Sequence, residues 1–171
     1  MKKPMINFIK NGVYDELYTP DYAIKPLLKY LHKDKIIWEC TDYGLSNITK
    51  ILKMMGYKVI STKKENFDFL KDNPCFEYDI IVTNPPYSLK DQFIKRCYDL
   101  NKPFCLLLPL TSLEGIKRGK MFRENDIELM VLDKRIDFNG KNKNWFNTSW
   151  FCYNVLPKQL IFEELVKEEG K

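Results

Sequence analysis

The sequence has little of what hydrolytic and metal chemistry usually needs. Its 171 residues include a single histidine, His32, and five cysteines that form no Cys-x-x-Cys pair. A zinc site built on two histidines or on a Cys-x-x-Cys pair is excluded, and a Ser-His-Asp triad would have to use His32, which we expect at a solvated helix end. The odd number of widely spaced cysteines predicts no disulfide framework. Any reaction must therefore depend on other groups.

Long hydrophobic runs are also missing. No segment approaches the ~18 consecutive apolar residues that a membrane-spanning helix requires, although 44% of the residues are hydrophobic. The first apolar stretch, residues 4–9, is too short and too polar for the core of a signal peptide. We therefore expect a cytoplasmic protein with no membrane partner. The length is that of one globular domain, here residues 1–171 with no separate target-recognition domain.

Short apolar runs alternate with segments of helical length along most of the chain. The apolar runs predict strands at residues 36–40, 57–61, 78–83, 104–108, 127–132 and 150–156. Helical spacing predicts helices at 24–33, 46–56, 88–98 and 158–169, with Ser46 as an N-cap and Ser88 and Asp91 as a capping box. Strands that alternate with helices predict an α/β fold with a mostly parallel sheet and helices on both faces.

One polar segment, Asn84-Pro85-Pro86-Tyr87, directly follows the third predicted strand. Its two prolines hold the backbone extended and lack amide hydrogens, which leaves backbone carbonyls to accept hydrogen bonds. The side-chain oxygen of Asn84 and the carbonyl of Pro85 suit the two hydrogens of one planar amino group, and Tyr87 offers a flat ring beside it. Parallel sheets bind ligands at the carboxyl ends of their strands. The segment therefore predicts a site for a substrate that carries a planar amino group.

The apolar strand, this segment and the helix after it resemble motif IV of the amino-group methyltransferases that use S-adenosylmethionine, and most of all the adenine-N6 DNA methyltransferases. The resemblance covers about residues 18–155 and implies a Rossmann-like class I methyltransferase fold. It implies that Asn84, Pro85, Pro86 and Tyr87 are catalytic. It also implies that S-adenosylmethionine is the cofactor and is bound by Tyr18, Thr19, Pro20, Glu39, Gly44, Asp68 and Phe69. In the family pattern the first three would contact its methionine part, and Asp68 and Phe69 its adenine.

The cofactor loop departs from the family pattern at two places. The family loop reads acid-Pro-x-x-Gly-x-Gly, whereas here Cys40 stands at the proline position and Gly44 is the loop's single glycine. Glycines in such a loop let the backbone approach the cofactor closely. After the second strand, where the family has an acidic residue for the ribose hydroxyls, the chain has Thr62-Lys63-Lys64, with Glu65 nearby. These departures predict weak cofactor binding, or a protein that kept the fold and lost turnover.

The charge distribution favours a nucleic-acid substrate over a protein. The net charge is +5, and two basic clusters suit phosphate contacts: Lys117, Arg118, Lys120 and Arg123, then Lys134, Arg135, Lys141 and Lys143. Residues 133–149 add Phe138 and Trp145, and this mixture of cations and aromatic rings suits unstacked bases. Solvated surface is an equally good interpretation of either cluster.

The expected activity is methyl transfer to the N6 amino group of adenine in DNA, with low sequence specificity or with specificity supplied by a partner protein. Three alternatives stay open. The same Asn-Pro-Pro-Tyr pattern occurs in methyltransferases that act on RNA bases and in those that act on a glutamine side chain of release factors, because these substrates share a planar amino group. A non-catalytic binding protein with the same fold would account for the departures in the cofactor loop.

Overall fold

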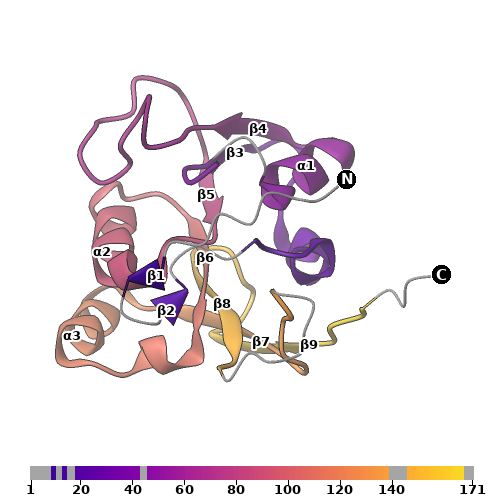
Figure 1. Cartoon of the computed structure of the whole chain (residues 1–171), viewed down its shortest axis with the longest axis vertical. Helices are drawn as coiled ribbons and strands as arrows, with labels where there is room; N and C mark the ends of the chain where they lie inside the picture. The colour runs from indigo at the N-terminus through magenta and orange to yellow at the C-terminus, as the bar shows by residue number, and fades with distance from the viewer. Residues whose placement is uncertain (1–8, 11–12, 15–17, 43–45, 139–145, 168–171) are drawn as a thin grey trace.

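The computed structural model describes residues 9–10, 13–14, 18–42, 46–138 and 146–167. Its centre is a seven-stranded sheet in the order β4-β3-β5-β6-β8-β7-β9 (Figure 1). The strands are β3 (Ile36–Glu39), β4 (Lys58–Ser61), β5 (Ile80–Thr83), β6 (Phe104–Pro109), β7 (Glu128–Leu132), β8 (Thr148–Tyr153) and β9 (Leu160–Glu163). Within this sheet β8 runs antiparallel to β6 and β7, and the other strands are parallel. Two short strands, β1 (Ile9–Lys10) and β2 (Val13–Tyr14), pair separately and antiparallel.

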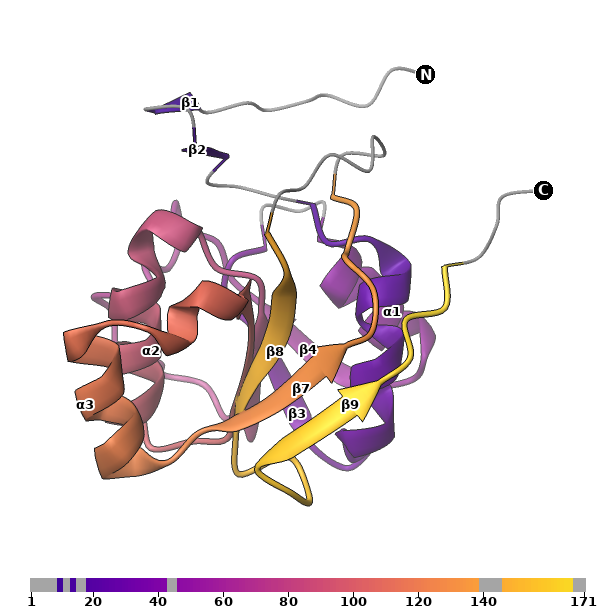
Figure 2. The ribbon, with the colours of Figure 1, turned by 90° about the horizontal axis from the view of Figure 1, so that it is seen from below.

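Helices cover both faces of the large sheet (Figure 2). The 3-10 helices η1 (Asp21–Ala23) and η2 (Lys25–Tyr30) and the helix α1 (Asn47–Met54) pack on one face. The helices α2 (Lys90–Asp99) and α3 (Ile116–Asn125) pack on the other, preceded by η3 (Tyr87–Leu89) and η4 (Leu110–Leu113). None of the helices among the described residues combines the length and hydrophobicity needed to cross a bilayer.

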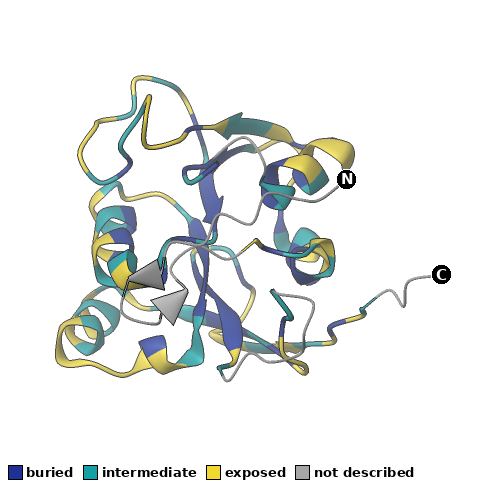
Figure 3. Ribbon diagram, viewed as in Figure 1, coloured by how far each residue is buried: buried dark blue, intermediate teal, exposed yellow. Residues whose placement is uncertain are grey.

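The strands of the sheet centre are buried on both sides, as Figure 3 shows. Along β6, Cys105 and Leu107 join the apolar cluster under η2 and α1, whereas Phe104, Leu106 and Leu108 join the cluster under α2 and α3. A strand with an apolar cluster on each face must be apolar at every position, which explains the unbroken runs in the sequence. The predicted α/β fold with a mostly parallel sheet and helices on both faces is confirmed.

The predicted boundaries of α1 are correct because local chemistry determines both ends. The hydroxyl oxygen of Ser46 accepts a hydrogen bond from the Thr49 amide at 3.2 Å, which satisfies one of the free amides of the first turn. After the helix, Gly56 adopts a φ of 81°, a conformation that residues with a Cβ rarely adopt. The chain then turns directly into β4.

The helix predicted at residues 24–33 is the 3-10 helix η2, which follows η1 and ends at Tyr30. Pro26 has no amide hydrogen to donate to the carbonyl four residues before it, so a regular α-helix cannot run unbroken from η1 into η2. The backbone closes shorter turns instead, such as the 2.9 Å bond from the Leu27 amide to the Ile24 carbonyl. His32 follows these turns and is exposed.

The capping box predicted from Ser88 and Asp91 is wrong. The 3-10 turn η3 occupies residues 87–89, so the N-cap position of α2 falls on Leu89, which makes no side-chain cap. The Asp91 carboxylate instead forms an ion pair of 2.5 Å with Arg118 of α3. The Asp91 carboxylate therefore joins α2 to α3 and does not cap α2.

The tail helix predicted at 158–169 is also wrong within the described residues. Leu160–Glu163 forms β9 and pairs with β7 in a parallel ladder, and no helix follows up to Lys167. The glutamates and lysines here favour a helix, but a short helix gains little stability by itself. Pairing with β7 satisfies the backbone groups on that side of the strand and places Ile161 against the core, so the tertiary contact outweighs the local preference for a helix.

Candidate active site at the carboxyl edge of the sheet

The carboxyl ends of β3, β4, β5 and β6 meet along one edge of the sheet, which we call the carboxyl edge. Glu39 ends β3 and Thr83 ends the neighbouring β5. The Thr83 hydroxyl donates to Glu39 Oε1 at 2.7 Å, and the amide and hydroxyl of Thr41 each donate to the same oxygen at 2.9 Å. Two threonines from separate segments thus hold one carboxylate in place.

The Glu39 carboxylate is buried and only half satisfied. The residue is 1% exposed, and its second oxygen, Oε2, has no hydrogen-bond partner in the described part of the chain. Burial raises the pKa of this carboxyl to about 7, against the lowering effect of the hydrogen bonds from Thr83 and Thr41. A buried acceptor without a donor costs free energy, so a ligand that donates a hydrogen bond to Oε2 would be stabilised there.

The segment predicted to contact the methionine part of the cofactor lies beside the loop that follows Glu39. Asn47, the first residue of α1, donates from its side-chain amide to the carbonyl of Thr19 at 2.8 Å. Thr19 is buried, Tyr18 is partly exposed, and Pro20 is intermediate. Gly44 lies outside the described residues. The structure therefore brings residues 18–20 and the start of α1 together at this edge.

Asp68 and Phe69, predicted to bind the cofactor's adenine, have structural contacts of their own. The Asp68 carboxylate accepts a hydrogen bond from the Leu70 amide at 3.0 Å and lies 3.3 Å from the Lys71 ammonium. Phe69 is 3% exposed and stacks on Phe93, with ring centroids 4.9 Å apart. Their roles as cofactor ligands stay predictions.

The Asn84–Tyr87 segment leaves β5 at the carboxyl edge, next to Glu39. The Asn84 carbonyl is 3.5 Å from the Thr41 hydroxyl, which also contacts Glu39 and Thr83, so the segment adjoins the carboxylate network. Pro85 is buried, and the Pro86 carbonyl accepts a hydrogen bond from the Leu89 amide at 3.0 Å, which opens η3. Asn84 and Pro86 are half-buried.

Tyr87 faces the protein and not the solvent. The residue is 7% exposed, and its ring contacts Phe146 edge-on at a centroid distance of 5.8 Å. Its hydroxyl is buried without a hydrogen-bond partner among the described residues, and burial raises its pKa. The sequence predicts a flat ring for the substrate to stack on, whereas the structure buries that ring and packs it against Phe146.

Several polar residues at the carboxyl edge were missed by sequence reasoning. Thr41 and Thr83 hold Glu39, and three further hydroxyls are buried without a partner in the described chain: those of Ser112, Thr148 and Ser149. Thr148 and Ser149 begin β8, opposite the end of β6. No local signal marks them, because their burial depends on pairing between distant strands.

The basic cluster of α3 is only partly available to a ligand. The Arg118 guanidinium pairs with Asp91, donates to the Ser112 carbonyl at 2.8 Å and also contacts the Glu114 carbonyl, so it joins α2, η4 and α3. Lys117, Lys120 and Arg123 are exposed. In the second cluster Lys141 and Lys143 lie outside the described residues, as does Trp145. The exposed Arg135 donates to the side chain of Asn147 at 2.6 Å.

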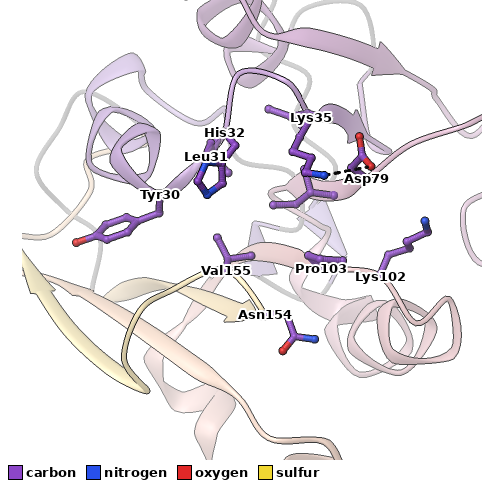
Figure 4. A pocket seen from close by; sticks show the side chains of 11 residues that line it. Tyr30, Leu31, His32, Lys35, Asp79, Lys102, Pro103, Asn154 and Val155 are labelled. Atoms are coloured by element: carbon purple, nitrogen blue, oxygen red, sulfur yellow. Dashed lines mark ion pairs between the residues drawn. The ribbon is translucent and has the colours of Figure 1, made fainter.

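Two hollows of the surface lie at the opposite, amino edge of the sheet. One of about 310 Å³ lies between Lys35, Asp79, Lys102 and Asn154 (Figure 4), and a second of about 470 Å³ adjoins it at Asp79 and Lys102. Lys35 and Asp79 form an ion pair of 4.0 Å there. None of the predicted site residues lines either hollow. We place the candidate site at the carboxyl edge, because ligands of parallel sheets bind there.

Among the described residues, no group of three or more His, Cys, Asp or Glu side chains is placed to hold a metal ion. The polar groups at the carboxyl edge instead suit hydrogen bonding to an organic ligand. The buried carboxylate accepts, and the hydroxyls of Ser112, Thr148 and Ser149 can donate or accept.

No family model matches this chain. Among curated proteins it is similar to the type II methyltransferase M.MgeORF184P of Mycoplasma genitalium, with 28% identity over 141 residues. The match covers 73% of this chain and 44% of the relative, so the chain spans less than half the length of that protein.

Two solved structures are also similar. PH1948 of Pyrococcus horikoshii, assigned as an RNA methyltransferase, superposes with a TM-score of 0.51 and 13% identity, covering 80% of this chain and 82% of its own. The modification subunit assigned to a type I restriction enzyme of Vibrio vulnificus superposes with a TM-score of 0.46 and 11% identity, covering 94% of this chain and 49% of its own. This TM-score is too low to support an argument about the fold. The sheet, its helices and the first superposition identify the fold as that of the Rossmann-like class I methyltransferases.

Proposed function

We propose that this chain transfers a methyl group from S-adenosylmethionine to the exocyclic N6 amino group of adenine in DNA. The observation that carries the proposal is the position of Asn84-Pro85-Pro86-Tyr87, at the end of β5 and beside the buried Glu39 carboxylate at the end of β3. Similarity to a type II methyltransferase supports methyl transfer, although the match covers 44% of that protein.

The residues at the carboxyl edge fit the proposed cofactor in part. S-adenosylmethionine, when bound, supplies an electrophilic methyl group. Glu39 Oε2 is a buried acceptor suited to a hydroxyl or ammonium donor. The segment Tyr18-Thr19-Pro20 lies beside the start of α1 at the same edge. No acidic side chain follows β4 at the position expected to bind the ribose. Thr62 stands there, and its hydroxyl accepts a hydrogen bond from the Trp38 indole at 2.9 Å, while Glu65 is exposed. We therefore expect weak cofactor binding that depends mainly on Glu39.

Asn84 and Pro85 are the groups that would act on the substrate. The amino nitrogen of adenine is a poor nucleophile because its lone pair is delocalised into the ring. Two acceptors directed at its hydrogens, the Asn84 side-chain oxygen and the Pro85 carbonyl, raise the electron density on nitrogen and favour the pyramidal geometry of the transition state. The remaining contribution of the protein is to position the two reactants.

Base capture would require two movements. Adenine in a duplex must first leave the base stack, and Phe146 must move away from the edge of Tyr87 so that the base can stack on that ring. Exposed cations on α3, namely Lys117, Lys120 and Arg123, would then hold the phosphate backbone. Phosphate contacts carry no sequence information, so we expect low sequence specificity unless a partner protein supplies it.

The test is a transfer assay with labelled methyl groups, run in parallel on duplex DNA, single-stranded DNA, RNA and a release-factor protein. We expect label on DNA, and none on a matched duplex in which inosine replaces adenine and removes the amino group. Label on RNA alone or on protein alone would overturn the DNA assignment. If calorimetry detected no cofactor binding and no substrate took up label, the non-catalytic alternative would be correct.

A further inference from the structure

The sheet ends at β9, and the outer side of this strand is open. β9 pairs with β7 through Gln159 and Glu163, whose carbonyls accept from the amides of Leu129 and Asp133 at 2.8 and 3.1 Å. Odd-numbered residues of β9 therefore turn their backbone groups toward β7, and even-numbered residues turn theirs away from it. No described segment pairs with that outer side, and Figure 2 shows β9 at the margin of the sheet.

The even-numbered side chains of β9 are apolar and exposed. Leu160 is 51% exposed and Phe162 is 72% exposed, both on the same face of the strand. On the other face, Ile161 packs on the core and Glu163 binds Lys29 and Tyr30 of η2 at 2.5 Å each. An open strand edge with exposed apolar side chains readily pairs with another strand, and proteins usually block such edges.

We propose that this edge pairs with the β9 of a second copy of the chain, antiparallel and centred on Ile161. Leu160 then lies opposite Phe162 of the second copy, and Lys158 lies opposite Glu164 of the second copy. All four residues are exposed in the single chain. Because Leu160 and Phe162 direct their backbone groups outward, each Leu160–Phe162 pair exchanges two backbone hydrogen bonds, and Lys158 and Glu164 meet just beyond the ends of the strand. The two-fold symmetry of the dimer repeats every contact once.

Complementarity along the strand selects this register over its neighbours. A shift of two residues in one direction places the Glu164 carboxylate opposite Leu160, and a shift in the other direction places the Lys158 ammonium opposite Phe162. A shift of one residue opposes side chains that point to different faces of the sheet. The proposed register is the one that matches apolar with apolar and cation with anion at the exposed even-numbered positions 158, 160, 162 and 164.

The first test is the mass of the chain in solution, measured by sedimentation equilibrium from about 1 to 100 μM, the range expected for a small interface. We expect a monomer–dimer equilibrium that Phe162→Glu weakens at least about tenfold, because the new carboxylate faces Leu160 twice in the dimer. Met54→Glu is the matched control: Met54 is 80% exposed on α1, so its change should leave the dimer intact. A monomer at every concentration, or a dimer insensitive to Phe162→Glu, would overturn the proposal.

The second test addresses the register by charge reversal. Lys158→Glu places a carboxylate opposite Glu164 of the second copy, and Glu164→Lys places an ammonium opposite Lys158, so each single change should weaken the dimer. The double variant restores an opposite pair and should restore dimerisation. Both side chains are exposed, so each variant should keep the fold of the wild type, which circular dichroism checks at a concentration where the chain is monomeric. Failure of the double variant to recover would contradict the register.

Discussion

The two edges of the central sheet differ in what they offer a ligand. The amino edge has open space, with hollows of about 310 and 470 Å³, and its charged groups reach solvent or pair with one another, as Lys35 and Asp79 do. The carboxyl edge has buried polar atoms without partners in the described chain: Glu39 Oε2 and the hydroxyls of Tyr87, Ser112, Thr148 and Ser149. Each such atom costs ~1–3 kcal/mol, whereas an open hollow filled with solvent costs almost nothing. Buried polar atoms without partners are therefore a better guide to the candidate site than the volume of a hollow.

The largest expected effect separates the two edges by activity. Asn84→Ala removes one of two acceptors that act mainly in the transition state, so methyl transfer should fall roughly a hundredfold or more while cofactor affinity barely changes. The control at the amino edge is Asn154→Gly, which deletes an amide at a position with a φ of 53° that glycine adopts without strain. The measurement is kcat for both variants. Equal losses at the two edges would contradict the assignment of the site.

The next effect concerns stability and the buried carboxylate. Because the folded pKa of Glu39 is raised from 4.5 to about 7, the folded state binds its proton more tightly than the unfolded state does. The contribution of this group to stability is therefore complete below pH 4.5 and is lost as the pH rises to about 7. Glu39→Gln stays neutral, so across that interval it should gain a few kcal/mol in unfolding free energy relative to the wild type.

Urea denaturation at steps across this pH range measures the difference. Glu65→Gln removes an exposed carboxylate close to the same edge and serves as the control for net charge. Parallel pH curves for the wild type and Glu39→Gln would show that the carboxyl titrates normally. Cofactor affinity measured on the same proteins should fall for Glu39→Gln and stay unchanged for Glu65→Gln.

A smaller effect is expected on nucleic-acid affinity. Replacing Lys117 and Arg123 by Ala should weaken binding equally for all DNA sequences. The slope of the logarithm of the association constant against the logarithm of the salt concentration should fall by about one for each phosphate that the protein no longer neutralises. The matched change at the amino edge, Lys35→Ala with Lys102→Ala, removes the same charge and should leave the slope unchanged. Titrations of fluorescent DNA at several salt concentrations compare the two pairs. If both pairs reduced affinity equally, net charge and not position would govern binding.

The smallest effect is expected at Tyr87. Tyr87→Phe removes a buried hydroxyl that has no partner among the described residues, so stability should stay the same or rise by up to ~1–3 kcal/mol. Base stacking needs the ring and not the hydroxyl, so turnover should persist. Tyr87→Ala should instead weaken base capture by ~1–3 kcal/mol. A large loss of kcat in Tyr87→Phe would show that the hydroxyl participates in the reaction.

Much of the fold could be predicted because local patterns agree with the tertiary environment. The apolar runs that contain Trp38, Ile81 and Leu106 form buried parallel strands, and Ser46 caps α1. Prediction failed where distant contacts compete with local preference. Residues 158–169 are rich in glutamate and lysine, which suit a helix, yet β7 offers residues 160–163 a parallel strand to pair with. Asp91 has the spacing of a capping residue, yet Arg118 of α3 takes its carboxylate.

The candidate site divides in the same way. By itself the sequence determined that Asn84-Pro85-Pro86-Tyr87 ends a buried strand, because two prolines and an apolar run are local features. Only the tertiary structure decided that Thr83 and Thr41 hold Glu39, that Tyr87 faces inward against Phe146, and that β9 leaves an open edge. Glu39 and Thr83 are 44 positions apart, and their contact exists because β3 and β5 are neighbours in the sheet. Burial and hydrogen-bond satisfaction are properties of that packing, which no single segment contains.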